Sequence, residues 1–370
     1  MHGSRLLLTT LAGVVLLASQ AGPSINLTDT SRIKSYGGFG AGAWPPASWR
    51  PYAATSPFNS PIDRADAVHP RSAEIVRRVL SWGRPSDLLA GVADTPEDYD
   101  RPIYFARSDD PVYKLVPTRP WGRNPIAGKR IRVPGRARAA GGSDGHLTVI
   151  QPDGMEYDLW QVRRRSPRGG RLLFGWGGRL RIDGDGRGSG ATASEFGSAA
   201  GIIRASELRA GQIDHALALV VRCTGNDLGF GFGVIPARRY DQGSAFVYPA
   251  SKGATACTGN SAGAPPTGAR FRLDLSDDEL LQLPIPRWKT AILRALAHYG
   301  AYVADTGGAG FGFLAESGSS YTSFGREDPM VEFARQAGLP RRDDGVYVMD
   351  LASGVDWARK LRVLKPPPPG

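Results

Sequence analysis

The sequence predicts a mainly β fold, an antiparallel β-sandwich of jelly-roll type with a few accessory helices. Short segments in which apolar and polar residues alternate recur along the chain, and Gly, Pro, Asp and Ser separate them. Only three segments have helical periodicity, and they do not alternate with the strands as a parallel βαβ sheet would require. Hydrophobic residues make up 41% of the 370 residues, which is enough to bury a sizeable core and excludes wholesale disorder.

The predicted strands have a period of two. In the clearest of them Phe271, Leu273 and Leu275 alternate with polar residues, which is typical of a strand with one buried face. The segments of this kind are 103–106, 146–150, 156–162, 179–182, 215–221, 245–248 and 270–275.

Three helices are predicted between these strands. The first begins with Ser72 as its cap and ends at Gly83, and the longest runs from Trp288 to Val303. The third begins at Asp328 with a proline in its first turn and ends at Gly338.

The N-terminal segment has the pattern of a secretory signal peptide. A positive start is followed by an apolar run that is too short to span a bilayer, and small residues then stand at the expected cleavage positions. We therefore expect a secreted protein without membrane insertion. The expected organisation is a signal peptide (1–21), a Gly/Pro-rich tether (22–56), a single β-sandwich domain (57–364) and a Pro-rich tail (365–370).

The two cysteines agree with an oxidising compartment. Cys223 and Cys257 each begin the tetrapeptide Cys-Thr-Gly-Asn, and an even pair in an exported chain predicts one disulfide. The alternative is a cysteine nucleophile. The net charge of +11 favours an anionic partner, with an extracellular glycan as the expected one. No nucleic-acid-binding pattern occurs in the sequence, so a nucleic-acid partner is not expected.

A hairpin around Pro152-Asp153-Gly154 is the most informative segment. A three-residue loop sets Val149 opposite Tyr157 and Leu147 opposite Leu159, so that all four apolar side chains share one face. The opposite face then carries the polar and aromatic members of the two strands: His146, Thr148, Glu156, Asp158 and Trp160.

This polar face is the predicted catalytic site. His146 and Asp158 are diagonal neighbours, so we assign His146 as the proton-transfer group and Asp158 as its partner or as the nucleophilic carboxylate. Trp160 is the expected platform for a sugar ring, with Glu156, Gln161 and Arg163 as further substrate-binding residues. The alternative is an exposed outer sheet face with incidental polar residues.

Two more residues are held as catalytic candidates. His215 begins a strand whose apolar residues share its face, so it is either a buried structural histidine or a group at the mouth of the groove. Asp305 stands between an apolar run and a glycine turn, where it can fix the loop or act as a second catalytic carboxylate.

No cofactor is expected. The segment from Asp183 to Ser189 partly resembles a calcium loop, but Arg187 stands where a third oxygen ligand belongs. A Gly-rich hairpin is the favoured interpretation and calcium is the alternative. The histidines have no metal-ligand spacing.

Several short segments together resemble a group of uncharacterised exported bacterial proteins. They are Asp144-Gly145-His146, Tyr157-Asp158-Leu159-Trp160, His215-Ala216-Leu217, Tyr299-Gly300 and Asp305-Thr306-Gly307-Gly308. The resemblance covers residues 55–315 and implies a shared secreted fold without naming a reaction. The expected function is a polysaccharide-acting enzyme, either a glycoside hydrolase or a polysaccharide lyase. The alternative is a non-catalytic glycan-binding or cell-wall-associated protein.

Overall fold

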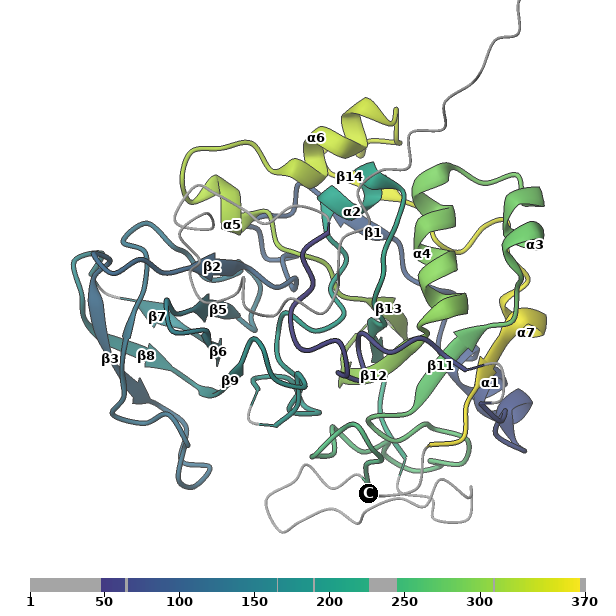
Figure 1. The fold of residues 1–370 in the computed structure, drawn as a ribbon, viewed down its shortest axis with the longest axis horizontal. Coiled ribbons are helices and arrows are strands. Elements are labelled where there is room, and N and C mark those ends of the chain that lie inside the picture. Colours follow the sequence, from purple (N-terminus) through teal and green to yellow (C-terminus); the bar gives the residue numbers. More distant parts are fainter. Residues whose placement is uncertain are drawn as a thin grey trace, which may run out of the picture.

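The chain folds into sheets that are stacked in layers and covered on one side by helices (Figure 1). The structure is a computed structural model that describes residues 48–63, 66–164, 166–188, 190–225, 245–308 and 310–366. It is mainly β, as predicted, with more strand than helix. The predicted signal peptide and the part of the predicted Gly/Pro-rich tether before residue 48 lie outside the described residues.

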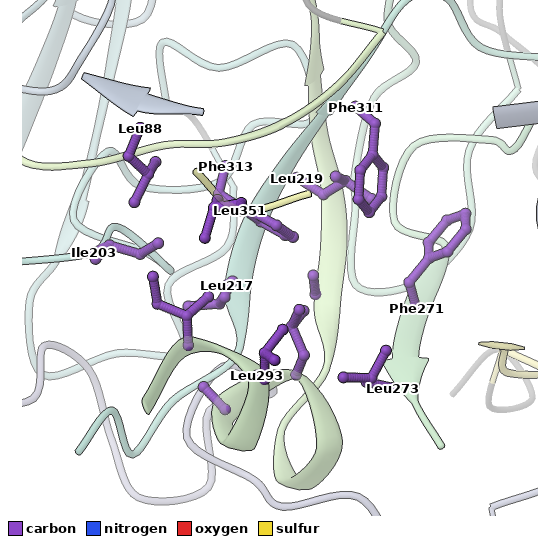
Figure 2. Close-up of a cluster of buried hydrophobic side chains, with 14 of the residues drawn as sticks. Leu88, Ile203, Leu217, Leu219, Phe271, Leu273, Leu293, Phe311, Phe313 and Leu351 are labelled. Atoms are coloured by element: carbon purple, nitrogen blue, oxygen red, sulfur yellow. The ribbon is translucent and has the colours of Figure 1, made fainter. Parts of the chain in front are cut away.

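The first layer is a five-stranded sheet with the order β13-β10-β12-β11-β15. Its strands are β13 (Phe311–Phe313), β10 (Leu217–Val221), β12 (Ala301–Thr306), β11 (Arg270–Leu273) and β15 (Leu361–Val363). Helices cover one face of this sheet and enclose the largest cluster of buried apolar side chains, part of which is drawn in Figure 2. The helices of the chain are α1 (Ser72–Leu80), α2 (Ala205–Ala210), α3 (Asp277–Gln282), α4 (Arg287–His298), α5 (Ser319–Thr322), α6 (Pro329–Gln336) and α7 (Trp357–Lys360).

The second and third layers are four-stranded sheets. The inner sheet has the order β2-β5-β6-β9, and the outer sheet has the order β4-β3-β8-β7. The inner strands are β2 (Ile103–Phe105), β5 (Leu147–Ile150), β6 (Met155–Trp160) and β9 (Trp176–Arg181). The outer strands are β4 (Arg130–Arg132), β3 (Val112–Pro117), β8 (Gly170–Phe174) and β7 (Arg163–Arg164). A short ribbon of β1 (Leu88–Ala90) and β14 (Tyr347–Met349) completes the strands.

Both faces of the inner sheet are buried. Leu147 and Leu159 lie in a cluster shared with Leu115 and Leu172 of the outer sheet. On the other face, Ile150 belongs to a cluster that also contains side chains of β10 and β12. The inner sheet is therefore the middle of a three-sheet stack, and side chains on either of its faces are removed from solvent.

The sheets are mixed rather than purely antiparallel. The pairs β2/β5, β3/β8 and β10/β12 are parallel, and the other pairs are antiparallel. Two sheets do pack face to face as in a sandwich, but the topology does not confirm a jelly roll. The parallel pairs arise from long connections that local periodicity does not encode.

The predicted hairpin register is confirmed. Leu147 pairs with Leu159, Thr148 with Asp158, and Val149 with Tyr157 across the antiparallel ladder of β5 and β6. The amide of Gln151 donates to the carbonyl of Met155 at 2.8 Å and closes the three-residue loop.

The longest predicted helix was extended too far. It ends at His298, and Val303 lies in strand β12. The cause is Gly300, whose φ is +72°. A Cβ atom at this position would lie 2.4 Å from the carbonyl oxygen of Phe271, so only glycine fits. This left-handed residue stops the helix and turns the chain back into the five-stranded sheet.

Other boundaries also differ from the prediction. Residues 245–248 form only an isolated bridge at Phe246 rather than a strand. The cap of α1 is Arg71, and the Ser72 hydroxyl accepts instead from the amide of Val363. The last residues of the predicted tether are packed, since Tyr52 is buried with 3% exposure. The disulfide between Cys223 and Cys257 is present, as predicted.

Candidate functional site

Two adjoining cavities form a cleft between the inner sheet and the five-stranded sheet. The larger, of about 770 Å³, is walled by tryptophans and is called here the tryptophan chamber. The smaller, of about 600 Å³, contains Leu88, Val92 and Phe313 and is called the aliphatic chamber. Three residues line both chambers and so mark the waist of the cleft: Asp144, Asp305 and Thr306.

The wall of the tryptophan chamber is built from three indoles. Trp160 at the end of β6 is paired across the ladder with Trp176 at the start of β9. Trp121, from the loop between β3 and β4, stacks on Trp160 with a centroid distance of 5.5 Å and an interplanar angle of 25°. The exposed fraction of Trp121 is 45%, so a broad apolar surface is open to solvent. Such surfaces suit the apolar face of a sugar ring.

Asp144 is held at the waist by its neighbours in the inner sheet. Its Oδ1 accepts a hydrogen bond from the indole Nε1 of Trp160 at 3.0 Å, and its carbonyl accepts from the amide of Gln161 at 2.7 Å. Gly145 follows with a φ of +45°, a conformation that favours glycine. The side chain of Asp144 is 41% exposed, so this carboxylate is both fixed and accessible.

A β-bulge in strand β12 directs the side chain of Asp305 toward the waist of the cleft. Leu219 pairs with Val303, but the next residue, Val220, pairs with Asp305 because Ala304 is skipped. Strict alternation would put Asp305 on the face of Val303, which is covered by helices. The extra residue moves it to the opposite face, where the cleft lies, as bulges beside functional sites commonly do.

Asp305 is set in a largely buried charge cluster. Its Oδ2 lies 3.3 Å from Nη2 of Arg101, and its Oδ1 accepts from the amide of Thr306 at 2.9 Å. Burial raises the pKa of the Asp305 carboxyl, Arg101 partly offsets that shift, and the charge of Asp144 adds to it. Asp305 therefore stays protonated to a higher pH than an ordinary aspartate.

His146, the predicted proton-transfer group, also reaches this cleft. It lines the tryptophan chamber although only 2% of it is exposed. Burial and the neighbouring Arg101 hold the pKa of His146 well below its usual range, so the imidazole is neutral. Its Nε2 lies 3.8 Å from Oδ2 of Asp144, and its Nδ1 has no partner among the described residues. The structure thus brings together His146, Trp160 and Asp305 from the predicted set.

Asp158 and Glu156 do not line the cleft. Both are fully buried, so the prediction that they line an open groove is wrong, although His146 and Trp160 at one end of the same face do line the tryptophan chamber. Asp158 accepts from the Thr148 hydroxyl at 2.8 Å and from the amide of Ser198 at 3.1 Å. Glu156 accepts from the Tyr52 hydroxyl at 2.9 Å. The register was right, but Tyr52 and residues 196–200 cover the face.

The buried carboxyl pair makes stability depend on pH. Burial, followed by the charge of Asp158, holds the pKa of Glu156 well above its usual range. The folded state therefore binds more protons than the unfolded state, and the free energy of unfolding falls as pH rises above the ordinary glutamate value. We expect Glu156→Gln to flatten this decline in urea unfolding between pH 5 and pH 9. Glu74→Gln, on the exposed side of α1, should keep the wild-type decline. If the free energy of unfolding of Glu156→Gln fell with pH as steeply as that of the wild-type protein, this explanation would be wrong.

The other predicted residues lie outside the cleft. Nε2 of His215 is 3.0 Å from Oε1 of Glu207, and the histidine is buried. The Gln161 side chain accepts two hydrogen bonds from Arg119, at 2.9 and 2.8 Å. Arg163 is exposed on β7 of the outer sheet. None of these three lines either chamber.

Further residues of the cleft were not assigned a role from the sequence. In the sequence, Asp144 stands out only as part of a short motif, and no local pattern marks Arg101 or Trp121 as a functional residue. Glu195 lines the tryptophan chamber with a φ of +63°, uncommon for a residue other than glycine, and accepts from the Ser251 hydroxyl at 2.9 Å. Lys252 lies over the ring of Trp176 at 5.8 Å.

Within the described residues, no group of three or more His, Cys, Asp or Glu side chains could hold a metal ion. In that same part of the chain, no helix has the length and apolar character needed to cross a membrane. Comparison of the chain with known protein families, curated proteins and solved structures found no match.

Proposed function

We propose that this protein is a secreted glycoside hydrolase that cleaves an extracellular polysaccharide at the waist of its two-chambered cleft. The observation that carries the proposal is the position of Asp144 and Asp305, which are shared by both chambers beside a wall of three tryptophans. Glycoside hydrolysis typically needs two carboxyl groups that flank the bond to be broken.

The two carboxyls differ in the way that this reaction requires. The raised pKa of Asp305 suits the proton donor, which protonates the glycosidic oxygen as the bond between that oxygen and the anomeric carbon breaks. Asp144, more exposed and hydrogen-bonded to an indole, suits the carboxylate that stabilises the positive charge developing on the sugar ring. Water then supplies the hydroxyl of the new reducing end, and its proton restores the acid.

Hydrolysis fits this site better than β-elimination. A lyase needs a free cation to neutralise the uronate carboxylate and a base to take the α-proton. At the waist of the cleft, Arg101 is already paired with Asp305 and the Nε2 of His146 faces Asp144, while the cation of Lys252 lies over the ring of Trp176 on the wall of the tryptophan chamber. The neutral His146 leaves the charge of Asp144 uncompensated, which favours its role beside a developing cation.

Secretion is part of the proposal. The apolar N-terminal run with its small-residue end supports export, and the disulfide between Cys223 and Cys257 agrees with an oxidising compartment.

The test is an assay on a panel of neutral and uronic polysaccharides. New reducing ends without an ultraviolet-absorbing product are the expected result. Products that absorb as unsaturated uronates would replace the hydrolase by a lyase. Retention on the polysaccharides without any product would replace it by a non-catalytic glycan-binding protein. If the protein neither cleaved nor bound any of the polysaccharides, the glycan proposal would be overturned.

The exposed indole should govern substrate binding. We expect Trp121→Ala to raise KM by about fivefold with a smaller change in kcat, because a lost ring contact is worth roughly 1 kcal/mol. Trp121→Phe should recover part of the loss, since it restores an aromatic face. Steady-state kinetics on the cleaved polysaccharide measure both values, and an unchanged KM in the alanine variant would remove Trp121 from the binding surface.

A further inference from the structure

The outer sheet carries a row of basic side chains that the cleft does not use. Lys114 of β3 lies directly opposite Arg130 of β4 on one side and Arg171 of β8 on the other. All three are exposed, whereas the flanking Tyr113 and Leu115 are buried in the sandwich. The row therefore crosses three adjacent strands on the solvent face.

The row extends in both directions. Arg163, on the edge strand β7, is exposed and pairs with Leu173, two residues beyond Arg171 on the same face. Beyond Arg130, a cavity of about 390 Å³ has Arg130, Arg132, Gln151 and Asp153 among its polar lining residues. Basic side chains thus stand on all four strands of the outer sheet, and one end of the row opens into a polar hollow.

Nothing in the described chain neutralises the central row. Lys114, Arg130 and Arg171 take part in no ion pair with a carboxylate of the described residues. Like charges directly opposite one another in a sheet are destabilising. The arrangement therefore has no explanation in the stability of the sheet and points to an external anion.

We propose that this basic row binds an acidic polysaccharide that carries carboxylates, at a surface separate from the cleft. Neighbouring strands are about 4.8 Å apart, so the cations repeat at close to the length of one sugar in an extended chain. Planar guanidinium groups match carboxylates with two parallel hydrogen bonds. A flat sheet face accepts an extended polymer without a deep groove. This surface would hold the polymer whether or not the cleft cleaves it.

The two surfaces are joined by the strands themselves. Lys114 lies three residues, roughly 10 Å, before the end of β3, and the following loop carries Trp121 into the tryptophan chamber. Strand β8 likewise ends two residues before Trp176. A polymer held on the outer sheet is therefore retained close to the tryptophan wall.

The test uses a triple variant of the full chain, Lys114→Gln, Arg130→Gln and Arg171→Gln. Its matched control replaces three exposed arginines elsewhere: Arg77→Gln, Arg136→Gln and Arg359→Gln. Binding to polygalacturonate is measured by calorimetry at about 0.1 M salt, with polyphosphate and dextran as comparison polymers. Every chain carries Asp305→Asn and Trp121→Ala, so that cleavage and binding in the tryptophan chamber are weakened equally in all the variants compared.

We expect the row variant to lose about tenfold or more in affinity for polygalacturonate, and the control to lose much less. The slope of log affinity against log salt should fall in magnitude by about two, because three cations no longer release counterions. Equal losses in both variants would reduce the interaction to net charge and overturn the proposal. A loss confined to polyphosphate would overturn the choice of a carboxylate polymer, and binding of dextran with equal strength would overturn the role of charge.

Discussion

Asp305→Asn should lower the turnover of the cleaved polysaccharide by about a hundred- to ten-thousand-fold, the usual contribution of a positioned general acid. The substitution keeps the size of the side chain and one oxygen, which can still accept from the Thr306 amide. It removes the proton that the glycosidic oxygen needs. A substrate with a good leaving group, such as an aryl glycoside, depends less on that proton, so its turnover should fall much less. This difference between substrates identifies the proton donor.

The same variant should change the pH profile. In the wild-type protein, burial raises the pKa of Asp305, so activity is lost on the alkaline side as this group loses its proton. Residual activity of Asp305→Asn should lack that limb. Asp144→Asn should instead lower turnover of both substrates, because its charge is needed whatever the leaving group.

A surface variant controls for the effect of any new amide. Asp278→Asn lies at an exposed position in the first turn of α3, outside both chambers and the basic row of the outer sheet. Its kinetics should match the wild-type protein. If Asp305→Asn cleaves polysaccharide at an unchanged rate, Asp305 is not the acid and the proposed mechanism is wrong.

The hairpin shows what local sequence can predict. The alternation of apolar residues around Pro152-Asp153-Gly154 fixed which side chains share a face, and the ladder of β5 and β6 has that register. The pattern could not tell what lies above each face. Glu156 and Asp158 look like groove residues from the sequence, yet residues 196–200 and Tyr52 cover them. Burial of polar side chains by distant segments leaves no period in the local sequence.

The cleft itself is formed by residues that lie far apart in the sequence. Arg101, Asp144 and Asp305 come from three separate parts of the chain, and they meet because the inner sheet packs on the five-stranded sheet. Asp305 was a candidate because of its glycine turn, but its direction depends on a bulge opposite Val220. A bulge adds one residue without changing composition, so alternation alone would have turned Asp305 toward the helices. The parallel pairing of β10 with β12 likewise leaves no signal in the local sequence of either strand.

The largest effect on stability is expected at Glu207, which lines neither chamber of the cleft. This fully buried carboxylate lies 2.6 Å from Nη2 of Arg204 and 3.0 Å from Nε2 of His215, and it also accepts from the Arg204 amide at 3.0 Å. Burial alone would raise the pKa of Glu207, but Arg204 and His215 outweigh it and lower the pKa from 4.5 to about 2. Removing the negative charge would leave a buried guanidinium without its counterion.

Glu207→Gln should therefore lower the free energy of unfolding at pH 7 by about 3 kcal/mol. Because the folded-state pKa is depressed, the contribution of the carboxylate is fully present above pH 4.5 and is lost as pH falls toward about 2. The difference between wild type and variant in urea unfolding should accordingly be large at pH 7 and small near pH 2. The exposed Glu332, which pairs with Arg209 at 2.8 Å, provides the control, since Glu332→Gln should cost less than about 1 kcal/mol. A loss at position 207 no larger than this control would mean that the buried network contributes nothing beyond a surface pair.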